Sequence, residues 1–309
     1  MSDYDSPWKE ALEQFFPAFL AFFFPKVFVL IDWSRGYEGL DKEFQQIARE
    51  AVVGRRHADK LFKVWLKDGQ ETWILIHIEV QSQRDEEFPE RMYVYHYRVY
   101  DRFRRPVISL AILGDEDRDW RPDRYTYSLG GCSVDFVFPI AKLLDYDADL
   151  AVLETSTNPF APLVLAHLKT METRGDPTAR RGWKWRVIKG LYERGFSSDQ
   201  VRDLFRLIDW MMDLPSQLEE QLQHDLSQFE EEKQMPYVTS IERMALAKGK
   251  AEGKAESLLQ ILEQRFRLSV PPDLDTVIRS TGDLTKLERW TKLAFETNSL
   301  EEFRRQAQL

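Results

Sequence analysis

The chain of 309 residues is poor in cysteine and lacks several familiar catalytic motifs. Cys132 is the only cysteine, which excludes an internal disulfide framework and a zinc site built from several thiolates. The sequence shows no glycine-rich phosphate loop, no nucleophile elbow and no cysteine–histidine pair. These absences argue against a nucleotide-driven motor, a serine hydrolase and a thiol enzyme. The single cysteine also favours a reducing, cytoplasmic location.

A hydrophobic run long enough to cross a membrane is missing too. The most apolar stretch, residues 15–31, is interrupted by Pro17, Pro25 and Lys26, so we expect a core helix and a strand there and no membrane partner. Excess positive charge is also absent, since the net charge of −9 argues against a protein that coats nucleic acid. Two local basic stretches, residues 91–105 and 180–189, could follow a phosphate backbone or be solvated helix faces.

The hydrophobic pattern changes near residue 150. Before that point it predicts a helix at 38–52, a β-hairpin around Lys67-Asp68-Gly69, an amphipathic helix at 88–103, a strand at 107–113 and two short strands about Gly130-Gly131. After it, helices are expected at about 158–171, 183–195, 198–213 and 216–233. We therefore predict an α/β core at 1–150, a helical extension at 151–240, a low-complexity helical linker at 241–257 and a small helical domain at 258–309.

The second strand of the hairpin, in the stretch TWILIHIEVQSQ, has one apolar face and one face with polar groups. Side chains alternate along a strand, so the isoleucines and Val80 share one face, whereas His77, Glu79 and Gln81 share the other. A carboxylate buried in a core is costly unless it is paired or coordinated. Glu79 therefore calls for a partner.

The hairpin turn decides which partner Glu79 finds. With a three-residue loop and a left-handed Gly69, Asp59 lies opposite His77 and diagonal to Glu79. A two-residue loop would move Asp59 to the opposite face. In the first register two carboxylates converge, and such oxygen ligands suit Mg²⁺ or Mn²⁺. An ion held there can neutralise a phosphodiester and acidify a bound water.

Three segments carry a family resemblance: EAVVGRRHADKLFKV, ILIHIEVQSQ and FPERMYVYHYRVYDRF. In this order they resemble the PD-(D/E)XK nuclease superfamily and, more narrowly, the Rpn-type recombination-promoting nuclease / putative transposase family. The resemblance implies an α/β fold, with a PD-(D/E)XK-like mixed sheet flanked by helices and followed by an all-helical C-terminal region. It also implies a Mg²⁺-dependent DNA endonuclease linked to recombination or mobile DNA.

The resemblance assigns roles to five residues. Asp59 and Glu79 match the metal-binding acids, the Val80 carbonyl is a further ligand by position, and Glu50 matches the acid of the preceding helix. Gln81 occupies the position where most members have lysine, so the pattern reads ExQ instead of ExK. Glutamine is neutral and can only hydrogen-bond to the attacking water, whereas lysine also supplies positive charge.

Several basic residues near the site could act with these acids. Lys60, Lys63 or Arg98 could supply the charge that Gln81 lacks, and the residues expected to contact nucleic acid are Arg55, Arg56, Arg91 and Arg98. The tyrosines at 93, 95, 97 and 100 have helical spacing and are expected to pack against the sheet. An alternative is a catalytically silent module that binds DNA or a partner. The C-terminal helical region could also form a homo-oligomer.

Overall fold

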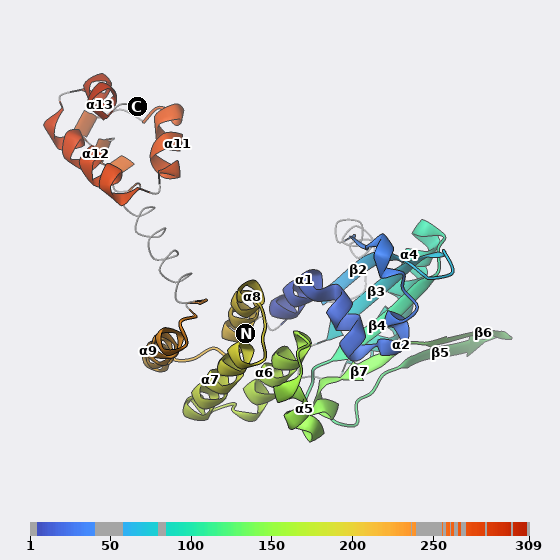
Figure 1. The fold of residues 1–309 in the computed structure, drawn as a ribbon. Helices are drawn as coiled ribbons and strands as arrows, with labels where there is room; N and C mark the ends of the chain where they lie inside the picture. The colour runs from blue at the N-terminus through green and yellow to red at the C-terminus, as the bar shows by residue number, and fades with distance from the viewer. Residues whose placement is uncertain are drawn as a thin grey trace. The chain divides into compact units, whose positions relative to one another are not determined.

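The computed structural model describes residues 5–40, 58–79, 85–235, 237–238 and most of 270–307, with a few residues between 255 and 266. Two compact units divide the chain, Met1–Asp225 and Leu226–Leu309, and the division falls within one helix. The first unit contains a mixed sheet with helices on both sides, and the second is helical (Figure 1). The expected α/β fold with a helical C-terminal region is thus confirmed.

The central sheet has five strands in the order β1-β2-β3-β4-β7. The first three are antiparallel, whereas β3, β4 and β7 run parallel, so the carboxyl ends of β3, β4 and β7 meet at one edge. The strands are β1 (Glu38–Gly39), β2 (Ala58–Trp65), β3 (Glu71–Glu79), β4 (Val107–Leu113) and β7 (Ile140–Lys142).

An aromatic helix covers one face of the sheet. Helix α1 (Asp5–Phe23) packs against β2 and β3, and the ring of Phe16 stacks on Phe62 of β2 with 3.9 Å between centroids. Pro17 lacks an amide hydrogen and disturbs the helix, which is kinked at Phe15. The expected core helix is therefore confirmed.

The strand expected after α1 is wrong. Pro25 begins the short helix α2 (Pro25–Phe28), which a 3₁₀ turn at Trp33–Arg35 follows, and Ile31 makes only an isolated bridge to Leu66. Proline is favoured in the first turn of a helix and cannot donate to a strand ladder, which explains the outcome. The helix expected at 38–52 is also wrong at its start, because Glu38–Gly39 forms β1; residues 41–57 lie outside the described part.

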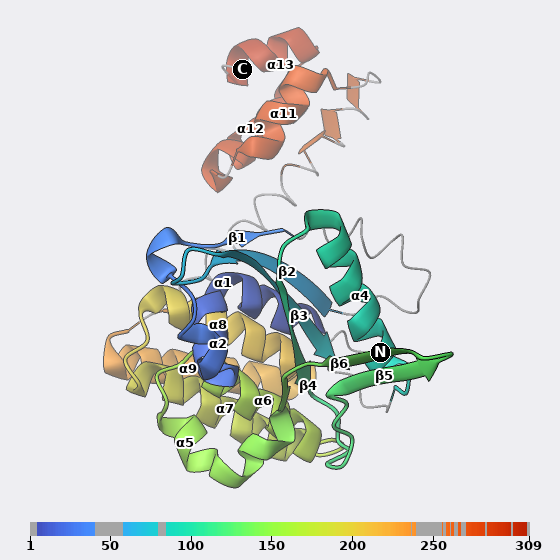
Figure 2. The same ribbon diagram turned by 90° about the vertical axis from the view of Figure 1, so that its right-hand side faces the viewer.

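The opposite face of the sheet carries α4 (Phe88–Phe103), the crossover between the parallel strands β3 and β4 (Figure 2). Tyr95 and Val99 of α4 pack on Leu61 and Leu75 of the hairpin. The helix ends at Phe103 and its C-cap, Arg104, is left-handed. The helix and strand predicted at 88–103 and 107–113 are confirmed.

A separate two-stranded ribbon follows β4. It consists of β5 (Arg124–Leu129) and β6 (Cys132–Val137), joined at Gly130-Gly131 as the sequence predicts. Gly130 and Gly131 both have positive φ, which glycine adopts without steric cost. The ribbon contacts α4 at its base and extends away from the central sheet (Figures 1 and 2).

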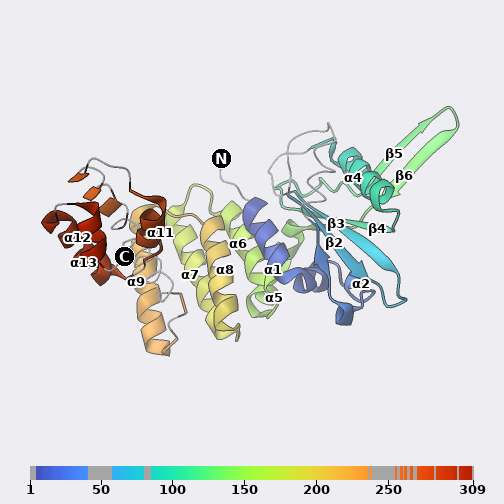
Figure 3. The same ribbon diagram turned by 90° about the horizontal axis from the view of Figure 1, so that it is seen from above.

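Helices follow the sheet as expected. After the 3₁₀ segment Leu143–Asp149, the helices are α5 (Leu150–Thr155), α6 (Phe160–Glu172), α7 (Pro177–Glu193), α8 (Ser198–Met211) and α9 (Ser216–Lys233). Helices α6 and α8 pack beside α1 (Figure 3), and the helices from α5 to α8 belong with the sheet to the first compact unit, which ends within α9. None of the described helices is both long and apolar enough to span a membrane.

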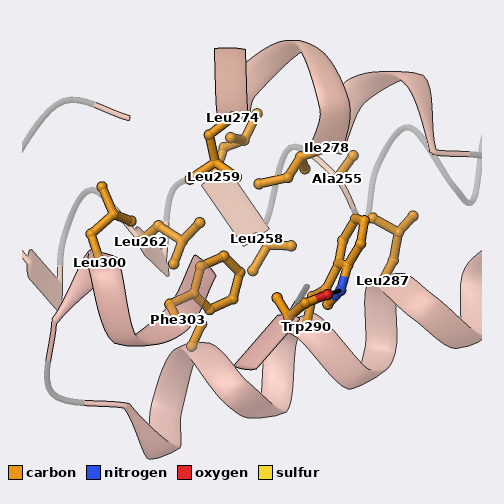
Figure 4. Packing of buried hydrophobic residues seen from close by; sticks show 12 residues of the cluster. Ala255, Leu258, Leu259, Leu262, Leu274, Ile278, Leu287, Trp290, Leu300 and Phe303 are labelled. Carbon is orange, nitrogen blue, oxygen red and sulfur yellow. Dashed lines mark hydrogen bonds between the residues drawn. The ribbon is translucent and has the colours of Figure 1, made fainter. Parts of the chain in front are cut away.

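The second unit has its own apolar core. Helices α11 (Pro272–Ser280), α12 (Leu284–Glu296) and α13 (Leu300–Ala307) enclose Leu258, Trp290 and Phe303 (Figure 4). Ala255, at the end of the predicted linker, also belongs to this core. The other residues of 241–257 lie outside the described part, and the four-part division of the chain stays a prediction.

Candidate active site at the ends of strands β2 and β3

The hairpin turn has the geometry on which the candidate site depends. The amide of Leu66 donates to the carbonyl of Gln70 at 2.8 Å, and the amide of Gly69 donates to the carbonyl of Leu66 at 2.9 Å. Gly69 has a φ of +87°. Lys67, Asp68 and Gly69 therefore form the three-residue loop that we expected, and the two-residue alternative is excluded.

The register that follows brings the two acids among the predicted metal ligands to neighbouring strands. Asp59 of β2 lies opposite His77 of β3, and Glu79 is two positions beyond His77. Asp59 and Glu79 are thus diagonal neighbours, a separation that side chains sharing an ion can bridge. Glu79 ends β3 opposite Leu113, at the edge where the parallel strands end.

The surrounding residues define the face on which these positions lie. Leu61 follows Asp59 by two positions and Leu75 precedes His77 by two, and both side chains pack against α4. Alternation along the strands therefore places positions 59, 77 and 79 on the face of the sheet that α4 covers. These three positions follow the apolar residues Leu61 and Leu75 on the same face, nearer the ends of the strands.

Two carboxylate-bearing positions at one strand edge are a suitable donor set for a hard cation such as Mg²⁺ or Mn²⁺. The side chains of Asp59, His77 and Glu79 lie outside those that the structure describes. Among the described side chains, no group of three or more histidines, cysteines and acids could hold a metal ion. The fit to a divalent ion thus rests on the backbone register and on the chemistry of the two acids.

Other predicted residues fall where the structure makes no statement. Glu50, Arg55, Arg56, Val80 and Gln81 all lie outside the described residues. Their assigned roles as helix acid, nucleic-acid contacts, carbonyl ligand and water-positioning amide stay predictions.

The two arginines predicted on α4 differ in their surroundings. Arg91 is only 2% exposed, pairs with Asp85 at 2.6 Å and lies over the ring of Phe88. A phosphate would have to displace Asp85 to reach the Arg91 guanidinium. The surroundings of Arg91 therefore indicate a structural role. Arg98 is half-buried and is more accessible than Arg91.

Three residues could supply the positive charge that Gln81 lacks, and two of them lie away from the candidate site. Lys60 is buried on the α1 face, where Glu13 contacts its amine. Lys63 shares the face of Asp59 but lies four residues away, 3.6 Å from Glu38 and 3.8 Å from Glu71. Arg98 is therefore the remaining candidate of the three.

The basic stretch 180–189 is used within the protein. Arg181 of α7 pairs with Asp225, Arg186 pairs with Glu154 at 2.6 Å, and Lys184 contacts the carboxylates of Asp209 and Glu219 at 2.6 and 2.8 Å. These ion pairs connect α7 with α5, α8 and α9. The alternative for this stretch, a solvated helix face, is wrong for Lys184, which is 0% exposed.

The tyrosines of α4 only partly follow the prediction. Tyr95 is buried against the sheet, as expected. Tyr93 is half-buried and stacks on Tyr125 of the ribbon, whereas Tyr97 and Tyr100 are exposed. Packing against the sheet is therefore wrong for Tyr97 and Tyr100, because the residues one turn apart on α4 that face the sheet are Phe88, Met92, Tyr95 and Val99.

A buried ion pair that the sequence does not predict lies where the carboxyl ends of the parallel strands meet. Lys142, at the end of β7, is in register with Leu113, which is itself in register with Glu79. The Lys142 amine donates to both carboxylate oxygens of Asp115 at 2.6 Å, and both side chains are almost inaccessible. This pair ties the loop after β4 to β7 and so fixes the edge. The short strand IAK gives no periodic signal from which to predict it.

Comparison with known proteins supports the family resemblance in this region. Residues 49–107 match the family model described as "Putative transposase, YhgA-like". No curated protein and no solved structure gave a significant match. The matched residues include β2, β3 and α4, and hence the two predicted metal-binding acids and Val80. Over this segment the chain is similar to the YhgA-like putative transposases, which confirms the narrower resemblance, to the putative transposase family.

Proposed function

We propose that this protein is a metal-dependent DNA endonuclease. The match to a transposase family suggests a role related to mobile DNA. The single observation that supports the chemistry is the hairpin register, which puts Asp59 and Glu79 on adjacent strands, diagonal to one another, at the end of the sheet. Two acids in this arrangement on a sheet edge are suited to hold a divalent ion against a phosphodiester.

Each residue of the site would have a separate role in binding the ion or in hydrolysis. Asp59, Glu79 and the carbonyl of Val80 bind the ion, and Glu50 assists from the preceding segment. Gln81 positions the attacking water through its amide. The bound Mg²⁺ or Mn²⁺ supplies charge neutralisation and a more acidic water. The buried ion pair of Lys142 with Asp115 joins the loop after β4 to the neighbouring strand end.

Plasmid cleavage tests this proposal. Supercoiled DNA is incubated with the purified protein in Mg²⁺, Mn²⁺, Ca²⁺ or EDTA, beside the Asp59→Ala and Glu79→Ala variants. We expect nicking with Mg²⁺ or Mn²⁺, no nicking in EDTA, and loss of cleavage in both variants at unchanged thermal stability. Unchanged turnover in either variant would overturn the site assignment.

A second candidate is a silent DNA- or partner-binding module on the same fold. The observation that favours it is the neutral Gln81 in place of lysine. Gln81→Lys separates the two readings: an active enzyme should keep or gain cleavage, because lysine stabilises developing negative charge. Retained DNA binding without cleavage, in both the natural chain and Gln81→Lys, would favour the silent module.

A further inference from the structure

The buried ion pair of Lys142 with Asp115 lies on the same face of the sheet as the candidate site. Lys142 is in register with Leu113, and Leu113 is in register with Glu79. Residues in register on parallel strands share a face of the sheet. Lys142 is therefore level with Glu79, at a distance of two strands, or about 10 Å between their Cα atoms.

The apolar cluster on this face surrounds the ion pair. Leu113 packs with Phe88 of α4 and with Trp120. The amine of Lys142 lies 5.6 Å from the centre of the Trp120 ring, and the side chains of Lys142 and Asp115 are 0% and 2% exposed. Burial of two charges is costly, and apolar side chains of similar volume often give equal or greater stability. Stability alone therefore gives no reason for an ion pair at this place.

The lysine binds both oxygens of the Asp115 carboxylate. Its amine donates to Oδ1 and Oδ2 at 2.6 Å each and to the carbonyl of Trp120 at 3.3 Å, which gives its three hydrogens three acceptors. Strand β4 lies between β3 and β7 in the sheet. Asp115, in the loop after β4, is thus bound by a side chain from the strand on the far side of β4 from Glu79.

Without the lysine, Asp115 would be a free acid beside the candidate site. Asp115 follows Leu113, the register partner of Glu79, by two residues. A position two residues beyond a register partner is a diagonal neighbour, which is also the relation of Asp59 to Glu79. Asp115 would then be a third carboxylate within reach of an ion that the other two acids bind.

A third carboxylate would change the chemistry of this ion. Mg²⁺ in enzymes that act on phosphates is usually held by one or two carboxylates, and it keeps its other positions for water and for substrate oxygens. Two carboxylates also balance its charge, whereas three would leave a net negative site facing a phosphodiester. We propose that Lys142 is a positioning residue of the metal site, which keeps Asp115 from becoming a third carboxylate ligand. This inference rests on the proposed function.

Titration of the full-length chain with Mn²⁺, followed by electron paramagnetic resonance, tests the proposal. Lys142→Gln removes the charge and can no longer bind both oxygens of Asp115. We expect this variant to bind Mn²⁺ about tenfold more tightly than the natural chain, because the ion gains a carboxylate ligand. The double variant Lys142→Gln with Asp115→Asn should return to the natural affinity. Cleavage should fall in the single variant and recover in the double one.

Lys184→Gln is the matched control. Lys184 is as deeply buried as Lys142 and contacts the carboxylates of Asp209 and Glu219 at 2.6 and 2.8 Å, in the helical part of the first unit. The loss of this lysine should lower the thermal stability in the same way but leave the affinity for Mn²⁺ unchanged. Thermal unfolding of every variant confirms that the fold is retained.

Three results would overturn the proposal. The first is natural affinity in folded Lys142→Gln, and the second is equal tightening in the single and double variants. The third needs only Asp115→Asn, which should bind Mn²⁺ as the natural chain does. Weaker binding would show that Asp115 is already a ligand. If the natural chain binds no Mn²⁺ that Asp59→Asn removes, the proposed site itself fails, and this inference fails with it.

Discussion

The two faces of the β2–β3 hairpin are built for different purposes. On the α1 face the packing is apolar and aromatic, with Phe62 stacked on Phe16 and Ile74 and Ile76 fully buried. On the α4 face the apolar packing stops at Leu61 and Leu75, and the strand-end positions beyond them hold Asp59, His77 and Glu79. One face stabilises the hairpin, and the other carries acids that stability alone would not select.

The largest expected effect is on the α1 face. Phe62→Ala removes a ring that is 2% exposed and stacked on Phe16, so we expect the free energy of unfolding to fall by about 3–5 kcal/mol. Chemical denaturation measures the loss in unfolding free energy. Phe62→Leu, which leaves a smaller cavity, should lose less. A loss below about 1 kcal/mol would contradict the account of this face as the source of stability.

An acid on the α4 face should behave in the opposite way. Asp59→Asn is expected to abolish cleavage and to leave the free energy of unfolding within about 0.5 kcal/mol, because the amide is nearly isosteric with the carboxylate but is a poor ligand for a divalent ion. Parallel cleavage and denaturation measurements on one preparation check it. If Asp59→Asn lost as much stability as Phe62→Ala, Asp59 would have a structural role. The two faces would then not differ in their contribution to stability.

The turn that sets the register should show a smaller effect. Gly69 has a φ of +87°, and a Cβ there would meet no atom within 4 Å, so the cost of Gly69→Ala is backbone strain alone. We expect a loss of about 1–2 kcal/mol, with cleavage retained. Gly69→Asn should lose less, since asparagine tolerates this conformation. If Gly69→Ala changed the metal dependence of cleavage but not the free energy of unfolding, the proposed dependence of the hairpin register on this turn would be contradicted.

The smallest expected effect is a pH dependence on the α1 face. Burial, with a contribution from nearby Lys9, lowers the pKa of Lys60 to about 8, although Glu13 contacts the amine. Between this value and the ordinary pKa of lysine, near 10.4, the unfolded chain binds more protons than the folded one. The contribution of Lys60 to the free energy of unfolding should therefore rise with pH through this window.

Lys60→Met provides the control for that prediction. The difference in unfolding free energy between the natural chain and the variant should shift in favour of the natural chain as the pH rises from 8 toward 10.5. A shift in the other direction would mean that the contact with Glu13 outweighs the loss of hydration.

The sequence predicts the parts of this architecture that local chemistry determines. The Lys67-Asp68-Gly69 turn fixes the register of the hairpin, because glycine accepts the left-handed conformation that the loop needs. The periodicity of residues 88–103 likewise predicts α4.

Features that arise from tertiary packing were not predicted. The pair of Lys142 with Asp115 joins residues 27 apart through a strand of three residues, too short for any periodic pattern. The exposure of Tyr97 and Tyr100 depends on where the ribbon and the sheet contact α4, which spacing within the helix does not reveal. Neither feature has a signal in the local sequence.

Binding of Mn²⁺ tests most directly the central claim that Asp59 and Glu79 share one ion. Titration of the natural chain, followed by electron paramagnetic resonance, should show a bound Mn²⁺ that both Asp59→Asn and Glu79→Gln remove. Glu71→Gln, at the other end of β3, should leave it in place. Binding that survives in either of the first two variants would show that the acids do not act together, and would contradict the site.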